Sequence, residues 1–287
     1  MPTNHRVNGR LHLSFTRPAL AANARLHVQL QSPPLRVVRA FPIDGHAVLT
    51  HLHNVSGGVL GGDHLSVCVD VQTGAHVQLT TTGATRVYRH RPGHADATQS
   101  THLCVAAGGL LEYLPDPLIP YAGARYHQRT RIELADDAGL FYWEVLTPGR
   151  EARQECFAYD LVTLQCDIMA QGRPLAVERV RLEPTQRALT SLMRLGLYRY
   201  SATFYICRVG VAAAVWQQLE TKLATIALEQ SEPDVILWGV STLPVHGLSV
   251  RALSINSRAI TTGLVRFWQV AKQELYGLAA IPPRKVY

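Results

Sequence analysis

The sequence predicts a mainly β protein, with a layered β-hairpin (β-helix-like) body and two α-helices in its C-terminal third. Most of residues 10–210 alternates apolar and polar side chains with a period of two, which is typical of strands. Turn residues divide these runs into short strands. Apolar residues at helical spacing follow in residues 211–230 and 257–276. No linker separates the two regions, so we expect a single domain over residues 1–287.

The centre of the chain shows the strand pattern most clearly. A glycine cluster at 57–62 precedes two alternating runs, 65–71 and 77–80, and a turn at 72–74 joins these runs. Period two places Cys68 on one face of its strand together with its polar neighbours. We interpret the two runs as a β-hairpin whose flanking polar loops carry the function.

Further strands follow at regular intervals. Small-residue corners precede several of them, at 74–76, 108–110 and 138–140. The recurrence favours stacked hairpin layers, although it is too irregular for a true sequence repeat. The expected strands lie at 97–106, 110–114, 126–134, 140–146, 157–168 and 175–182.

The last hundred residues predict two helices that lie on the β body. Two strands, 236–242 and 248–255, separate the helices, and Gly277 is placed to end the second. Ser257 or Thr261 is expected to cap its start. The apolar stripes that we expect to be buried are Val211, Val215, Leu219, Leu223 and Ile226 in the first helix, and Ile260, Leu264, Phe267, Trp268, Ala271 and Leu275 in the second.

Composition narrows the class of protein. Hydrophobic residues make up 47% and charged residues 17% of the chain, so it is globular. It contains no apolar run of about 20 residues and no apolar leader, so we expect a cytoplasmic protein without a membrane partner. The net charge of +7 is scattered along the sequence, which disfavours nucleic acid as a partner.

Cysteine and histidine give weak signals for a metal. The five cysteines contain no Cys-x-x-Cys pair, so free thiols are expected and a closed zinc site is not. His51 and His53 share one face of a predicted strand and could present two imidazoles to a metal ion. They lack a third ligand nearby in the sequence, so ordinary surface histidines remain the alternative.

Carboxylates are the strongest chemical signal. No Gly-x-Ser-x-Gly elbow is present, and the glycine cluster lacks the ending of a phosphate-binding loop. Glu144 lies inside an apolar strand and Glu178 lies beside two valines, which is costly unless the charge is paired. Pairing could come from Arg150, Arg153, Arg179 or Arg181; a polar internal passage or a metal contact is the alternative. The carboxylates considered are Asp63, Glu112, Asp116, Glu144, Glu155 and Glu178.

Several separated motifs resemble the UreD (UreH) family of urease accessory proteins. The central one is SGGVLGGDHLSVCVDVQTGAHVQLTTTGATRVYR, which begins at Ser56. The others are LEYLPDPLIPYAGARYHQ, EVLTPGREARQECF, PLAVERVRLEP and the closing PPRKVY, in the same order along the chain. Together they cover the chain from about residue 10 to its end. Arg86 stands where the family also uses lysine.

The resemblance implies a scaffold that is not an enzyme. Such proteins bind the urease apoprotein and, with a UreF-like protein and a UreG-like GTPase, help deliver nickel, which passes through an internal tunnel and is not held as a tight cofactor. On this resemblance Asp63, Glu144 and Glu178 are the expected nickel contacts. Thr81, Arg86 and Tyr88 belong to the matching loop motif, with a structural or partner-binding role. Scattered carboxylates suit transfer because they hold nickel weakly.

Two other functions remain open from the sequence. The first is a carbohydrate-active β enzyme that uses two of the carboxylates as acid and base. The second is a protein-interaction module without a metal role, which would use the surface of the helices.

Overall fold

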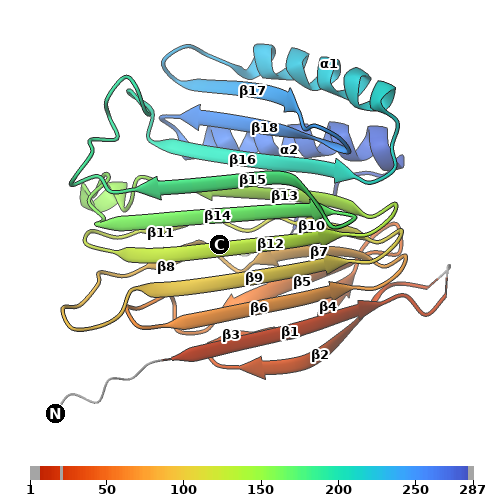
Figure 1. The fold of residues 1–287 in the computed structure, drawn as a ribbon, viewed down its shortest axis with the longest axis horizontal. Coiled ribbons are helices and arrows are strands. Elements are labelled where there is room, and N and C mark those ends of the chain that lie inside the picture. The colour runs from red at the N-terminus through yellow and green to blue at the C-terminus, as the bar shows by residue number, and fades with distance from the viewer. Residues whose placement is uncertain (1–6, 20–21, 284–287) are drawn as a thin grey trace.

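Two β-sheets stacked face to face form the body of the computed structural model, which describes residues 7–19 and 22–283 (Figure 1). In spatial order, the seven-stranded sheet contains β15 (Arg173–Leu182), β14 (Leu161–Ala170), β12 (Arg125–Leu134), β9 (Ala97–Val105), β6 (His64–Val71), β1 (Asn8–Thr16) and β2 (Arg25–Ser32). The main path of the eleven-stranded sheet contains β17 (Ile236–Thr242), β18 (Gly247–Ser254), β16 (Tyr200–Arg208), β13 (Gly139–Leu146), β10 (Leu110–Tyr113), β7 (His76–Thr81), β5 (Val48–Asn54) and β3 (Leu35–Arg36). The short strands β4 (Ala40–Pro42), β8 (Thr85–Val87) and β11 (Leu118–Pro120) join the same sheet.

The central pair of runs is not a hairpin, which corrects the sequence-based prediction. β6 pairs in parallel with β1 and β9, whereas β7 pairs in parallel with β5 and β10 in the other sheet. The turn between β6 and β7 therefore carries the chain from one sheet to the other. Both arrangements produce the same alternation in sequence, and only the pairing distinguishes them.

The small-residue corners are the points where the chain changes sheet, and they stack on one another. Each has a residue with positive φ within it or directly before it: Gly74, Gly108 or Asp137. Gly74 N–H donates to Ala107 O at 3.1 Å, and Gly108 N–H donates to Asp136 O at 3.1 Å. The body is thus a coil of parallel strands, as the β-helix-like prediction states, with antiparallel strands at its ends.

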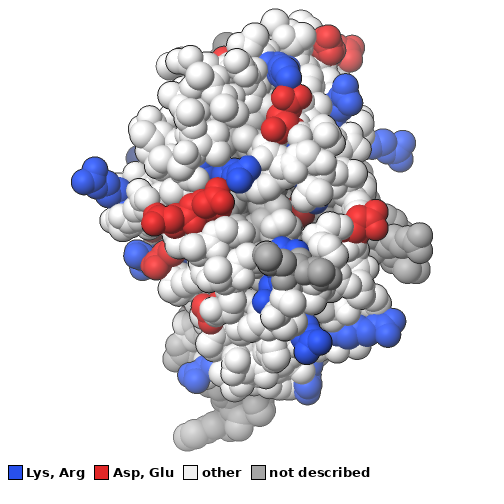
Figure 2. Space-filling view, turned by 90° about the vertical axis from the view of Figure 1, so that its right-hand side faces the viewer, with Lys and Arg blue, Asp and Glu red and all other residues white. Residues whose placement is uncertain are grey.

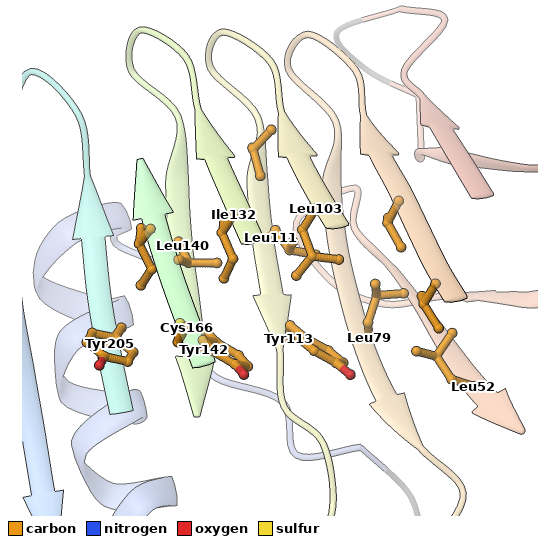
Figure 3. Packing of buried hydrophobic residues seen from close by; sticks show 14 of the residues in the cluster. Leu52, Leu79, Leu103, Leu111, Tyr113, Ile132, Leu140, Tyr142, Cys166 and Tyr205 are labelled. Atoms are coloured by element: carbon orange, nitrogen blue, oxygen red, sulfur yellow. The ribbon is translucent and has the colours of Figure 1, made fainter. Parts of the chain in front are cut away.

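The space between the sheets is filled by inward-facing side chains. Figure 3 shows Leu79, Leu111 and Leu140 on neighbouring strands of one sheet, facing Leu103 and Ile132 from the other. All five are buried. Stacked parallel strands place equivalent side chains side by side, so the apolar alternation becomes continuous rows in the core.

Two helices cover the outer face of the larger sheet. They are α1 (Ala213–Gln230) and α2 (Ser257–Tyr276), so the second matches its predicted range. Every apolar residue predicted for the face of α2 is buried. In α1, Trp216 is buried and Val215 is 39% exposed, so the buried face is turned by one residue from the predicted stripe. Asn256, not Ser257 or Thr261, caps α2: its Oδ1 accepts from Arg258 N–H at 2.9 Å.

The mainly β prediction with two C-terminal helices is confirmed, but the long strand β16 was missed, as were the short strands β8 and β11. β16 pairs with β13 and carries Phe204 and Ile206 toward the helices. Its alternation was present in the sequence, next to a turn-rich segment that has no strand pattern. None of the described helices is long and apolar enough to span a membrane. Residues 284–287 of the closing motif lie outside the described residues.

A buried ion pair joins α2 to the β body. Lys272 Nζ lies 2.7 Å from Glu112 Oε1, and Trp268 Nε1 donates to Glu112 Oε2 at 2.7 Å. The side chains of Lys272 and Glu112 are 5% and 1% exposed. Charges removed from water are tolerated only when both are paired and hydrogen-bonded, so α2 is fixed in register over β10.

We expect Lys272→Met to lower the free energy of unfolding by about 3–5 kcal/mol, because it leaves the Glu112 carboxylate buried without a cation. Urea unfolding measures the loss. The matched control is Lys222→Met, since the Lys222–Glu274 pair is solvent-exposed and should contribute less than about 1 kcal/mol. Adding Glu112→Gln to Lys272→Met should restore most of the stability; a double variant no better than the single one contradicts this account.

Candidate functional site

A cavity of about 590 Å³ lies between the two sheets, at the end where β13 faces β14 and β15. Its lining differs from the rest of the inner space because it carries polar groups. Glu144 comes from β13, Glu178 from β15 and Asp116 from the segment after β10. Cys166, opposite Glu178 in the pairing of β14 with β15, adds a thiol. The structure therefore brings together three of the six carboxylates considered from the sequence.

Glu144 points into this cavity because of the alternation along β13. Its neighbours Phe141, Trp143 and Val145 face the helices, while Tyr142 and Glu144 face the other sheet. Gln128 Nε2 donates to the Glu144 carboxylate. Burial raises the pKa of Glu144 to about 7, and the nearby Glu178 charge adds to the increase. Glu144 thus exchanges a proton near neutral pH, a property that groups in functional sites often show.

Glu178 is held between a tyrosine and an arginine. Tyr205 Oη donates to Glu178 Oε2, and Arg251 Nη2 lies 3.5 Å from Glu178 Oε1. The Arg251 side chain is 62% exposed, so this pair lies where the cavity meets solvent. The cavity is therefore open to solvent at its Glu178 end.

The arginines considered as partners for these glutamates bind other carboxylates. Arg150 Nε donates to Glu155 at 2.8 Å, and Arg181 Nε donates to Glu183 at 2.9 Å. Arg179 pairs with Asp167. The prediction that such pairing neutralises Glu144 and Glu178 is therefore wrong for these three arginines. Arg179 and Arg181 alternate with Glu178 along β15, so they point to the opposite face.

A row of three stacked tyrosines borders the cavity, and two of them, Tyr113 and Tyr142, line it. Tyr113, Tyr142 and Tyr205 lie on adjacent strands at matching register positions. Figure 3 shows their rings side by side. The ring centroids of Tyr113 and Tyr142 are 5.4 Å apart, and those of Tyr142 and Tyr205 are 6.3 Å apart. The stacked rings form a continuous aromatic row beside the polar groups of the cavity.

A second cavity, of about 220 Å³, adjoins the first. The two share four lining residues: Thr81, Thr85, Gln99 and Tyr113. The second cavity continues between the sheets toward the glycine cluster, where it is lined by His53 and by the threonine run. The inner space is thus extended along the stack of strands, with carboxylates at one end and the predicted loop motif at the other.

The loop motif is built around close backbone packing. Thr81 Oγ1 donates to Asp116 Oδ2 at 2.9 Å and accepts from Asp116 N–H at 2.9 Å. Val59 N–H donates to Arg86 O at 2.8 Å, which joins the glycine cluster to β8. A Cβ on Gly58 would lie 2.4 Å from Tyr88 Cε2 and 2.8 Å from Arg86 O, so only glycine fits there. The Arg86 side chain itself is exposed.

The remaining predicted residues lie elsewhere. Asp63 is 3% exposed and accepts from Leu60 N–H at 2.9 Å, so it closes the turn of the glycine cluster, and it does not line either cavity. His51 and His53 are close enough for His51 to contribute, after burial, to a lowered His53 pKa. Groups of three metal-ligating side chains do occur among the described residues, but they do not include these two histidines.

Several residues of the cavity were missed by sequence reasoning. Gln128, Cys166 and Arg251 line it from three different strands, and Tyr205, on a fourth, binds Glu178. A signal was present only for Gln128, which the alternation of its strand placed on the side of Tyr126 and Ile132. On the face drawn in Figure 2, Asp and Glu side chains lie among Lys and Arg side chains over the upper and middle parts, while Lys and Arg predominate at the lower end.

Comparison with known proteins identifies relatives along nearly the whole chain. A family model described as UreD urease accessory protein matches residues 7–287. The urease accessory protein UreD of Herpetosiphon aurantiacus is 46% identical over 282 residues, which cover 98% of this chain and 97% of that protein. The UreD of Cenarchaeum symbiosum is 32% identical over 257 residues, covering 88% of this chain and 87% of its own length.

The raised pKa of Glu144 predicts a pH-dependent stability. A carboxyl whose pKa is higher in the folded state than its ordinary value of about 4.5 stabilises the fold while protonated. That contribution is complete below pH 4.5 and is lost as the pH rises to about 7. We expect Glu144→Gln to gain on the order of 2 kcal/mol of unfolding free energy over the wild type between pH 4.5 and 8. Urea unfolding of both proteins at pH 4.5 and at pH 8 measures this difference in unfolding free energy. The control is Glu229→Gln, on the exposed face of α1, which should show no such gain.

We expect Gly58→Ala to destabilise the protein by about 1–3 kcal/mol, because the added Cβ displaces the Tyr88 ring or β8. Gly83→Ala is the matched control, since a Cβ there meets no atom within 4 Å. Thermal unfolding of both variants checks this expectation. Equal stability of the two would show that the glycine cluster is not packed as described.

Proposed function

The chain belongs to the UreD family of urease accessory proteins, and we propose that it passes nickel between its two sheets toward the urease apoprotein. As a member of this family it is a non-catalytic factor in urease maturation, and the family takes part in assembly of the urease nickel centre. The carbohydrate-active enzyme considered from the sequence is therefore excluded. Nickel is the cargo in this proposal and is held only in transit.

The two adjoining cavities carry this proposal. They share Thr81, Thr85, Gln99 and Tyr113, and they extend from the glycine cluster to the Glu178–Arg251 pair. Most of a β body of this kind is closed by aliphatic side chains. A polar space inside it has a free-energy cost, because buried polar groups lose hydration. A passage for a hydrated cation explains why the space is present.

The ligands along this passage suit release better than retention. Glu144 and Glu178 offer oxygen atoms, which bind nickel more weakly than a set of imidazoles or thiolates. Burial and the two glutamates raise the pKa of Cys166 well above its ordinary value, so its thiol stays protonated and is a poor ligand. Glu144, with its pKa of about 7, accepts a cation when it loses its proton.

The other predicted residues have structural roles in this proposal. Thr81 and Asp116 fix the point where the two cavities meet. Tyr88 and the backbone of Arg86 support the glycine cluster, with Asp63 closing its turn. The exposed Arg86 side chain is available to a partner protein. The partners we propose are the urease apoprotein, a UreF-like protein and, through that complex, a UreG-like GTPase.

Urease activation tests the passage directly. Glu144→Gln and Glu178→Gln, introduced separately and together into a host that expresses the urease genes, should reduce urease activity several-fold, with the double variant lowest. Each change keeps the side-chain volume and removes the charge that attracts nickel. Glu229→Gln on the exposed face of α1 is the matched control. Pull-down of the tagged chain, followed by measurement of nickel in the recovered urease, separates assembly from delivery.

The expected result is normal recovery of urease and the accessory proteins with less nickel in the enzyme. Full activation by the double variant would overturn the passage and favour an interaction module without a metal role. Loss of the partners in the pull-down would instead assign these glutamates to complex assembly.

A further inference from the structure

The outer face of the seven-stranded sheet carries a cluster of metal-ligating side chains that is separate from the inner cavities. Four neighbouring strands contribute to it: β1, β6, β9 and β12, which lie side by side in Figure 1. Their register forms two rows. His12, Cys68, His102 and Arg131 make one row, and Ser14, Asp70, Cys104 and Glu133 make the row two residues further along.

Two sets of three ligands result from these rows. In the first set, His12 Nε2 lies 2.7 Å from Asp70 Oδ2, and Cys68 Sγ completes a group whose atoms all lie within 4.8 Å of one another. In the second set, His102 Nε2 lies 3.3 Å from Glu133 Oε1 and 3.6 Å from Cys104 Sγ. Each set combines one imidazole, one thiol and one carboxylate.

We propose that His12, Cys68 and Asp70 bind a divalent transition-metal ion on the outside of the sheet. Three ligands bound at about 2.0–2.3 Å need a mutual separation close to the one present, so side-chain rotation alone brings them into position. Nitrogen, sulfur and oxygen donors together suit Zn²⁺, Ni²⁺ or Co²⁺, whereas Mg²⁺ and Ca²⁺ require oxygen donors. The fourth position is left to water, as in open metal sites.

The second set binds the same class of ion more weakly. Arg131 Nε donates to Glu133 Oε1 at 2.7 Å, so this carboxylate is already engaged by a fixed cation. Asp70 instead contacts His12, which belongs to the same set. The first set, on β1 and β6, is therefore the primary site, and the second lies on the next two strands, β9 and β12.

The site is accessible to a metal ion from solvent. The side chains of His12 and Asp70 are 39% and 31% exposed, and Cys68 is partly exposed. The strand backbones are fixed by pairing on both sides, so the three ligands are presented by a rigid surface. When the ion binds, Cys68 exchanges its S–H proton for the metal, and that proton passes to the buffer.

Cobalt binding to the purified full-length chain tests this proposal. Co²⁺ alone should produce a thiolate-to-metal charge-transfer absorption, which a site of oxygen and nitrogen atoms lacks. Cys68→Ser should remove the high-affinity part of the signal, weakening binding at least tenfold, and Cys104→Ser should remove only the weaker part. Cys156→Ser is the matched control, an exposed thiol outside the cluster, and should change nothing. Ni²⁺ should displace Co²⁺ and remove the signal.

A further pair of variants separates this site from the inner passage. Cys166→Ser and Glu144→Gln alter the cavity between the sheets and should leave the cobalt signal intact. The passage and the outer site can therefore fail independently. Persistence of the signal in the double variant Cys68→Ser/Cys104→Ser overturns the proposal, as does its absence from the wild type.

Protection from alkylation gives a second measurement that needs no variant. Ni²⁺ alone should slow the reaction of Cys68 with iodoacetamide, followed by mass spectrometry, while the reaction of Cys156 proceeds at its metal-free rate. If Cys68→Ser fails to fold, His12→Gln replaces it and should weaken cobalt binding to a similar extent. Equal reaction of Cys68 with and without Ni²⁺ overturns the proposal.

Discussion

In the β body each strand side chain points either into the space between the sheets or to the outer face of its sheet, and the rest of the structure depends on this alternation. Strands stacked in parallel and in register send alternate residues either between the sheets or out to the other face. Equivalent positions on successive strands therefore form rows. The same rule produces the rows of leucines in the core, the stacked Tyr113, Tyr142 and Tyr205, and the row of His12, Cys68 and His102 on the outer face.

The inner space changes from apolar to polar along the length of the strands. Toward one end of the strands, Leu103, Leu111 and Ile132 close it with apolar contacts. Toward the other end, Glu144 and Glu178 face the same space, beside the stacked tyrosine rings. Burial, and to a smaller extent the neighbouring Glu178 charge, raises the pKa of Glu144. The fold thus holds two carboxylates close together in a partly dehydrated space, an arrangement that a bound cation would stabilise.

The larger sheet can support that interior because its other face is anchored separately. β13 supplies Tyr142 and Glu144 to the inner space, and Phe141 and Trp143 to the core beneath the helices. The buried pair of Lys272 and Glu112 fixes α2 over this sheet. Both faces of one strand are therefore constrained, which keeps the Glu144 side chain in place without a direct partner arginine.

The sequence by itself determined the class of fold, the helix Ser257–Tyr276 and the family, because local periodicity and short motifs are properties of contiguous residues. It also identified Glu144 and Glu178 as carboxylates in an apolar context. Only the tertiary structure decided which strands pair: it turned the predicted hairpin into a change of sheet, and it placed Asp63 away from the two glutamates. Cavity walls and the ligand set His12, Cys68 and Asp70 join segments far apart in the chain. Such proximity depends on register between distant strands, which no local pattern encodes.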